Sequence, residues 1–219
     1  MSDPVALPRL RQVPSLAIGI TAWIIACVGL TYAMMAYDFT PGRTGPQPST
    51  WPTGLSAAFS PLAPRKMTVV AFVHPRCVCS RATVNQLLRV ALAHPEADVI
   101  AGMFTPTDAA GQKGWEDSEY AQSIRAALPQ AKLVFDRAGQ DAQRFGAYTS
   151  GTILVYNAQG HELFRGGITD RRGGEEDNPG LRQLTSTLAF RTPQQDKATP
   201  VYGCPIVTPG RVERAGETS

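Results

Sequence analysis

The longest hydrophobic stretch of the chain covers residues 15–37, and no charged residue occurs between Gln12 and Tyr37. A helix needs roughly 20 apolar residues to cross a bilayer. The pattern therefore predicts a transmembrane helix, with Tyr32 and Tyr37 at the far interface. A buried core helix is a second interpretation, although the stretch has no polar face. A cleaved signal peptide is a third, although the stretch is long for one and no clean A-x-A site follows it.

The segments on either side predict the orientation of this helix. Arg9 and Arg11 precede it within a polar segment, residues 1–14, and only Arg43 follows closely. The positive-inside rule places residues 1–14 in the cytoplasm and the rest outside, which in a bacterium means an inner-membrane protein with a periplasmic domain. Residues 38–66 are rich in proline, glycine, serine and threonine, which is typical of an extended, partly stiff tether.

A second apolar run opens the domain, which we place at residues 67–205, ahead of a tail at 206–219 that we expect to be disordered. Residues 68–73 (TVVAFV) combine apolar and β-branched side chains and predict a strand buried on both faces. An i, i+3, i+4, i+7 apolar pattern begins at Val84 and predicts a helix, with Ser80 as its N-cap.

The remaining apolar runs predict the rest of an α/β domain. Further strands are expected at residues 98–104, 132–136, 152–156 and 161–165, and further helices at 116–128, 139–145 and 181–190. A glycine-containing loop is expected after the second strand. Residues 157–160 form a short turn, so the last two strands should be an antiparallel hairpin. The expected order is βαβαβαββα.

The composition of the chain excludes some classes of function but does not identify one. The net charge is only +3 and no basic stripe carries interleaved aromatic residues, so we expect no nucleic-acid partner. Four cysteines do not predict a disulfide scaffold in a chain of 219 residues. Their positions are more informative, since Cys77 and Cys79 fall where the strand at 68–73 leads into a helix.

A helix N-terminus favours a thiolate, because its free N–H groups and dipole are positive. Arg76 and Arg81 add positive charge beside the two cysteines. The junction is therefore where we expect the chemistry of this protein.

The element order, with thiols at the first strand-to-helix junction, resembles the thioredoxin fold, a central mixed sheet flanked by helices. The resemblance covers residues 67–190. The second half of this region, from Phe135-Asp136 to residues 152–160, resembles membrane-anchored thiol oxidoreductases of the TlpA type. Five shorter pieces resemble the RedB-type branch: HPRCVCS at 74–80, TSG at 149–151, GGIT at 166–169, EDN at 176–178 and VYGCP at 201–205.

Two positions depart from ordinary thioredoxins. The C-x-x-C motif is absent: if Cys77 matches the attacking cysteine, Ser80 stands in the place of the resolving one and Cys79 is extra. Gly151 stands where thioredoxins carry a cis-proline opposite the thiols. In the family that residue presents backbone to a bound peptide and helps to keep metals from the dithiol, so both roles are open here.

The resemblance also implies which loops meet the thiols. Residues 148–151 and 166–178 should line one cleft with them, which makes Thr149, Ser150, Gly151 and Asn178 candidate substrate-binding residues. Asn178 has a second interpretation, because Asp177-Asn178-Pro179-Gly180 is also a good turn and helix start.

Our leading hypothesis is thiol–disulfide exchange with a partner protein, without a cofactor. Cys77 or Cys79 attacks the partner disulfide, and the other thiol, or Cys204, resolves the mixed disulfide. A Cys77–Cys79 bridge would close a small strained ring, which suits an oxidant or isomerase. The stretch from residue 191 to 203 spans about 40 Å when extended, enough to bring Cys204 back to the cleft. Cys204 is otherwise an inert cysteine.

Two other functions fit the same residues. His74, Cys77, Cys79 and Cys204 form a soft ligand set suited to Cu(I) or Zn, and Gly151 removes one obstacle to a metal. A redox-inert interaction domain with a structural Cys77–Cys79 bridge is the third candidate.

Overall fold

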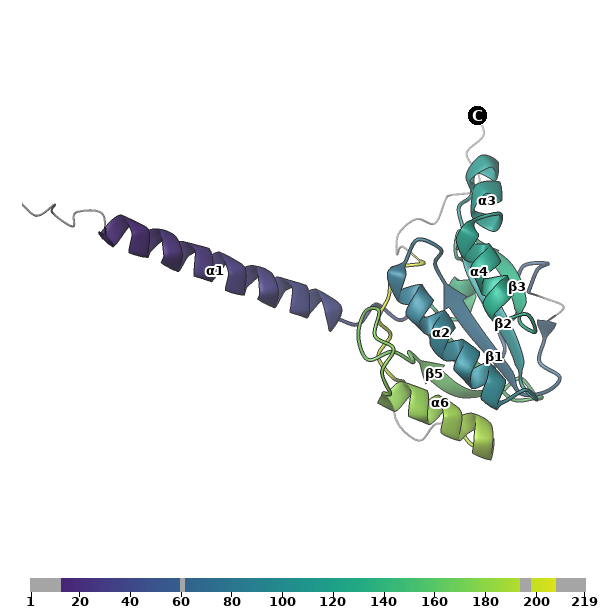
Figure 1. Cartoon of the computed structure of the whole chain (residues 1–219). Coiled ribbons are helices and arrows are strands. Elements are labelled where there is room, and N and C mark those ends of the chain that lie inside the picture. Colours follow the sequence, from purple (N-terminus) through teal and green to yellow (C-terminus); the bar gives the residue numbers. More distant parts are fainter. Residues whose placement is uncertain (1–12, 60–61, 194–197, 208–219) are drawn as a thin grey trace, which may run out of the picture. The chain divides into compact units, whose positions relative to one another are not determined.

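The computed structural model describes residues 13–59, 62–193 and 198–207, and it divides into two units at Asp38 and Phe39. The first unit is α1 (Val13–Asp38) (Figure 1). Its segment Leu16–Asp38 has a mean hydropathy of 2.0 and none of it is buried, so it is long and apolar enough to span a membrane. The interpretation as a buried core helix is therefore wrong. Residues 1–12, and residues 208–219 of the predicted tail, lie outside the described residues. The sequence predicts that the tail begins at residue 206, but Ile206 is buried in a hydrophobic cluster, so the ordered domain extends beyond residue 205.

The second unit is built on a five-stranded sheet in the order β3-β2-β1-β4-β5. The strands are β1 (Thr68–Val73), β2 (Asp98–Thr105), β3 (Lys132–Arg137), β4 (Thr152–Tyr156) and β5 (Glu162–Gly166). β1 runs parallel to β2 and antiparallel to β4, and β5 returns antiparallel to β4. This mixed sheet has the thioredoxin-like topology, which confirms the predicted fold class.

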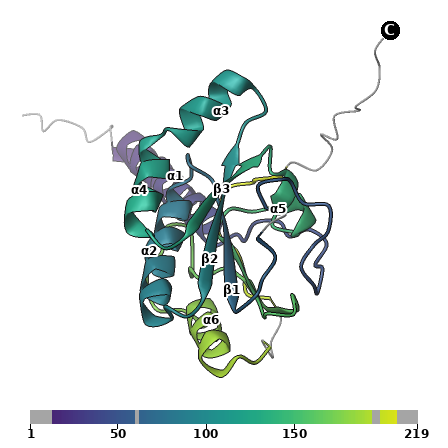
Figure 2. The same ribbon diagram turned by 90° about the vertical axis from the view of Figure 1, so that its right-hand side faces the viewer.

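Side chains of β1 alternate between two hydrophobic clusters, because successive residues of a strand point to opposite faces. The helices are α2 (Val78–Ala93), α3 (Ala109–Glu116), α4 (Glu119–Ala127), α5 (Gln140–Arg144) and α6 (Pro179–Phe190). Val69, Ala71 and Val73 pack with residues of α2, α4 and α6. Val70 and Phe72 pack on the other face with α5 (Figure 2). All six residues of β1 are buried, as the apolar run predicts.

The expected tether at residues 38–66 is largely part of the domain. The N–H of Gly42 donates to Val201 O (2.8 Å), and that of Trp51 donates to Gly160 O (2.7 Å). Phe59 is completely buried and stacks on Phe72, with ring centroids 5.8 Å apart. Apolar anchors between the prolines thus fix this segment on the sheet, and the prediction of an extended tether does not hold for residues 42–59.

Two local predictions were wrong. The loop expected after β2 contains α3, which forms despite two glycines of low helix propensity, Gly111 and Gly114. The N-cap of α2 is Cys77, and Ser80 lies inside the first turn. The Ser80 hydroxyl accepts a hydrogen bond from the His74 N–H (3.0 Å), so it fixes the turn before the helix and does not cap the helix.

Candidate functional site

Three thiols from two distant segments meet at the N-terminus of α2. Cys77 caps the helix, Cys79 lies in its first turn, and Cys204 comes from the segment that follows α6. The Cys204 thiol donates to the Cys77 sulfur across 2.6 Å, compared with about 2.0 Å in a disulfide bond. All three are free thiols in this structure. The pair in direct contact is therefore Cys77–Cys204, two residues 127 positions apart.

The Cys204 segment is held by the loop that precedes β4. The Ser150 N–H donates to Cys204 O (2.9 Å), and the Cys204 N–H donates to the Ser150 hydroxyl (2.9 Å). The Ile206 N–H donates to Tyr148 O (2.9 Å), and an isolated antiparallel bridge joins Thr149 to Pro205. The segment thus lies along this loop like a short additional strand.

Two glycines allow this close approach. A Cβ on Gly203 would lie 1.9 Å from Ser150 O, so no larger residue fits before Cys204. Gly151 has φ +89 and its N–H donates to Phe72 O (2.7 Å). Proline has φ near −65° and no N–H, so it cannot adopt this geometry. The local backbone at this position therefore accepts glycine and excludes proline.

Hydrogen bonds make Cys77 the most acidic of the three thiols. Burial opposes its ionisation, but donors around the sulfur outweigh burial and lower the pKa of Cys77 to about 7. The donors are the Cys204 thiol, the Ser150 hydroxyl, and the backbone N–H groups of Ser80 and Cys204. Cys77 is therefore about half thiolate near neutral pH.

The other two thiols are held in their protonated form. Burial, the hydrogen bond to Cys77 and the charge of Cys77 raise the pKa of Cys204 to about 12. Burial, followed by the charge of Cys77, also raises the pKa of Cys79. The negative charge of the cluster therefore lies on the Cys77 sulfur, and the Cys79 and Cys204 thiols stay protonated.

Arg172 is a site residue that the sequence did not single out. It donates a hydrogen bond to Gly203 O, and its bond and charge at Cys79 partly offset the causes that raise the pKa of that thiol. The loop that carries Arg172 is tied to α2 by Gln86, whose amide donates to Glu175 O (2.6 Å). The expectation that residues 166–178 line the cleft could have pointed to Arg172, since it is a cation in that loop. Arg76 instead lies over the ring of Trp115, 4.8 Å from its centroid.

The candidate substrate-binding residues separate into two groups. Ser150 contacts Cys77 and Cys204, and Gly151 lies beside it, next to Thr83. Thr149 is buried and its hydroxyl donates to Arg43 O (2.8 Å), so it fixes the loop. Asn178 is the N-cap of α6: its Oδ1 accepts from the Leu181 N–H (3.0 Å) and its Nδ2 donates to Ile168 O (2.9 Å). These contacts support the helix-start interpretation of Asn178.

The predicted soft-metal set is not assembled. Within residues 13–59, 62–193 and 198–207, no group of three or more histidine, cysteine or acidic side chains has an arrangement that could hold a metal ion. His74 is engaged elsewhere, because its Nδ1 accepts from the Arg76 N–H (3.2 Å) and its ring stacks on Phe104, with centroids 5.2 Å apart. Burial, followed by the charge of Arg76, lowers the pKa of His74.

Comparison with known proteins gives relatives in structure only. No protein-family model and no curated protein matches the sequence. An uncharacterized conserved protein from Geobacillus kaustophilus is 19% identical, with a TM-score of 0.55 over 78% of this chain and 93% of that one. A hypothetical protein from Sinorhizobium meliloti 1021 is 19% identical, with a TM-score of 0.54 over 78% of this chain and 96% of that one. A secreted Mycobacterium tuberculosis disulfide oxidoreductase homologous to E. coli DsbE is 17% identical, with a TM-score of 0.40 over 59% of this chain and 85% of that one.

Proposed function

We propose that this protein is a membrane-anchored, extracytoplasmic thiol–disulfide exchange protein whose working disulfide joins Cys77 to Cys204. The observation that carries the proposal is the 2.6 Å contact between these two sulfurs, one acidic and one held protonated. The Cys-x-Cys sequence then supplies one member of the pair, and Cys79 is a third thiol beside it.

The exchange moves two electrons between the pair and an external dithiol or disulfide. One cysteine of the pair forms a mixed disulfide with the partner, and the other resolves it. Cys77 is the thiolate of the reduced pair, because its pKa is the lowest of the three thiols. In the reduced protein the Cys204 S–H donates to Cys77, so the pair shares one proton, which leaves when the disulfide forms and is regained when it is reduced.

The proposed location follows from α1 and the charges before it. The helix is apolar enough to serve as an uncleaved anchor, and Arg9 and Arg11 precede it. The positive-inside rule then gives a single pass through a bacterial inner membrane, with the thiols in the periplasm. Stable disulfides belong to such an oxidising compartment. The kinship that we propose is with the RedB-type branch of thioredoxin-like proteins.

Peptide mapping of the oxidised protein tests the working disulfide. The full chain, in detergent and with Cys27→Ser to remove the membrane-segment thiol, is oxidised in air, alkylated and digested without reductant. We expect one bridge, Cys77–Cys204, and a free, alkylated Cys79. A Cys77–Cys79 bridge would instead support the strained-pair or redox-inert interpretation, and the absence of any bridge would refute exchange through these thiols.

Turnover with a disulfide substrate supplies the functional arm of this test. Cys77→Ser and Cys204→Ser should each abolish turnover, whereas Cys79→Ser should retain most of it, because Cys79 is outside the working pair. Equal loss in all three variants would contradict the assignment of the pair.

A further inference from the structure

The three thiols differ in how far solvent reaches them. Cys77 is 3% exposed and Cys79 is 5% exposed. Cys204 is half-buried and precedes Pro205, which is exposed. The residue whose thiol has the lowest pKa is therefore buried, and its partner Cys204 is the more exposed residue of the pair.

The segment that carries Cys204, and that contacts Cys77, is held in place on both sides of Cys204. Before it, an isolated parallel bridge joins Thr199 to Gly166, and Val201 is buried. After it, Ile206 is buried in the hydrophobic cluster that contains Phe145, where a Cβ on Gly139 would come within 2.9 Å of the Ile206 side chain. These contacts fix the segment at two points, so it cannot swing away as a free tail would.

The backbone edge beside Cys77 is also occupied. The Ser150 N–H and the Tyr148 carbonyl, which could pair with an incoming extended chain, already bond to Cys204 O and to the Ile206 N–H. Strand addition needs unpaired edge groups, and these two are taken. An external thiol therefore has no ready route to Cys77 along this loop.

We propose that an external thiol attacks the oxidised protein at Cys204, and that Cys77 is the leaving group. This inference rests on the proposed Cys77–Cys204 disulfide and assigns its two sulfurs. It reverses the roles expected from the sequence, in which a cysteine of the Cys-x-Cys motif meets the partner and Cys204 resolves.

The step balances as follows. The external thiolate forms a bond to the Cys204 sulfur, the Cys77–Cys204 bond breaks, and its electron pair leaves on Cys77 as a thiolate. A second external thiolate then attacks the partner sulfur of the mixed disulfide and releases Cys204, which takes up a proton. The partner is oxidised by two electrons and the protein is reduced. The product has the arrangement seen in the structure, with the Cys204 S–H donating to Cys77.

The acidities support this direction of cleavage. A thiol of lower pKa leaves faster in exchange. The donors that lower the pKa of Cys77 to about 7 include the Ser150 hydroxyl and the backbone N–H of Ser80, and neither of these two depends on the Cys204 thiol proton. Access and leaving-group quality therefore both favour attack on Cys204.

Glutathione is a suitable probe for the test. The full chain carrying Cys27→Ser and Cys79→Ser is oxidised, exposed briefly to glutathione, quenched with acid, alkylated and digested. Mass spectrometry then reads which cysteine carries glutathione and which carries the alkyl group. We expect glutathione on Cys204 and the alkyl group on Cys77, in roughly tenfold excess or more over the reverse pattern when extrapolated to zero time.

The matched control is the same protein in denaturant, where both sulfurs are equally accessible and the ratio should fall to near one. If the folded and denatured proteins give the same ratio, or if glutathione is found mainly on Cys77, the inference is overturned. The chain that retains Cys79 is measured in parallel, so that the result does not depend on whether the Cys79→Ser chain folds. Mass spectrometry reads each cysteine separately, so Cys79 does not obscure the other two. If no Cys77–Cys204 bridge forms in the first place, the proposed function fails and this inference fails with it.

Discussion

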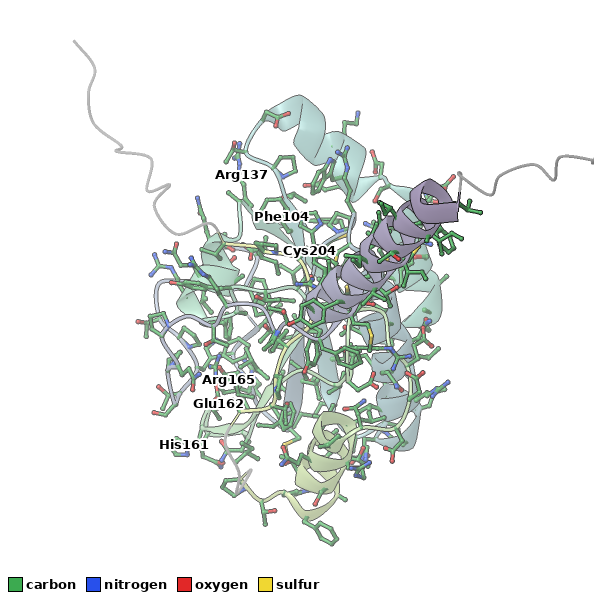
Figure 3. All side chains as sticks on the ribbon, turned by 90° about the vertical axis from the view of Figure 1, so that its left-hand side faces the viewer. Phe104, Arg137, His161, Glu162, Arg165 and Cys204 are labelled. Atoms are coloured by element: carbon green, nitrogen blue, oxygen red, sulfur yellow. The ribbon has the colours of Figure 1, made fainter. Side chains whose placement is uncertain are left out.

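Among the clusters of ionisable groups in the described part of this domain, two shift the pKa of their acidic group in opposite directions. One is the thiol cluster at the start of α2. The other joins Arg165 and Glu162 of β5 to Tyr156 of β4, away from Cys204 (Figure 3). Arg165 donates to both oxygens of Glu162 and to Phe145 O (2.8 Å), and the Tyr156 hydroxyl donates to Glu162 (3.3 Å).

Burial raises the pKa of the acidic group in both clusters, and the hydrogen bonds donated to that group decide whether its pKa ends above or below the ordinary value. At Glu162, burial outweighs the help from Arg165, and the pKa of the carboxyl is raised. At Cys77, burial is outweighed by four hydrogen bonds, and the pKa of the thiol is lowered. The ion pair lies within β5, and its hydrogen bonds to Phe145 O and from the Tyr156 hydroxyl join that strand to its neighbours. The thiol cluster instead keeps a reactive anion next to a sulfur with which it can bond.

Arg165→Met should have the largest effect, and its effect should fall on stability. The change leaves Glu162, whose side chain is 15% exposed, without its cation. Removing one partner of a fully buried pair costs about 3–5 kcal/mol, and the loss here should approach that range from below. Chemical denaturation of the full chain in detergent measures the loss. Adding Glu162→Gln should recover part of it, and a loss no larger than that of a surface substitution would show that the pair is not structural.

Ser150→Ala should change the acidity of the thiol cluster. The change removes the hydroxyl that donates to Cys77, and a hydrogen bond to a charged group is worth about 1.5–3 kcal/mol, so the pKa of Cys77 should rise by roughly 1–2 units. The pH dependence of thiolate absorbance measures the shift. Ser123→Ala is the control, because Ser123 is exposed and its hydroxyl donates only to Tyr120 O among the bonds described. Equal midpoints in the two variants would rule out the donor role of Ser150.

The pH dependence of stability should separate the reduced from the oxidised protein. The pKa of Cys77 is about 7 in the folded protein, below the value of about 8.5 for an unfolded cysteine. The reduced protein should therefore gain about 1–2 kcal/mol as pH rises from about 7 to 8.5, and lose it as pH falls through 7. Above that window the raised pKa of Cys204 reverses the slope. The oxidised protein, whose pair no longer titrates, should lack the gain when unfolding is measured across this range. Above the window it should keep only the part of the reversal that comes from the raised pKa of the free Cys79.

Arg172→Met should have the smallest effect. It removes the cation that favours ionisation of Cys79 and the donor to Gly203 O, so alkylation of Cys79 should slow by a few-fold, about 1 kcal/mol or less. Arg182→Met is the control, because Arg182 pairs with Asp177 on the exposed surface. Alkylation rates that do not differ between the two variants would remove Arg172 from the site.

Local patterns predicted the sheet well and the site only in part. The apolar run of β1 and the periodicity of α2 depend on neighbours in sequence, so their bounds follow closely from the pattern. The contact of Cys204 with Cys77 depends on how the chain returns after α6, which chain length permits but does not specify. Arg172 was missed for the same reason, since its role comes from a loop folded against α2.

Two errors have a common physical origin. Phe59 lies among prolines, so its segment is predicted to be a tether. The segment of α3 contains two glycines, so it is predicted to be a loop. In both cases the composition near the residue is unfavourable, and contacts with distant residues decide the structure. Phe59 gains a place in the core against Phe72, and Trp115 of α3 contacts the rings of Phe104 and His74.

The separation of Cys77 and Cys204 along the chain couples redox state to unfolding. A bond between residues 127 positions apart closes a loop that includes most of the domain. On the chain-entropy account, such a cross-link disfavours the unfolded ensemble by about 4–5 kcal/mol. If the proposed bond forms, oxidation stabilises the domain by closing the chain from the start of α2 to the Cys204 segment, and reduction removes that stabilisation. Resistance to proteolysis should accordingly follow the redox state of the protein, and a partner that reduces Cys204 also makes the domain easier to degrade.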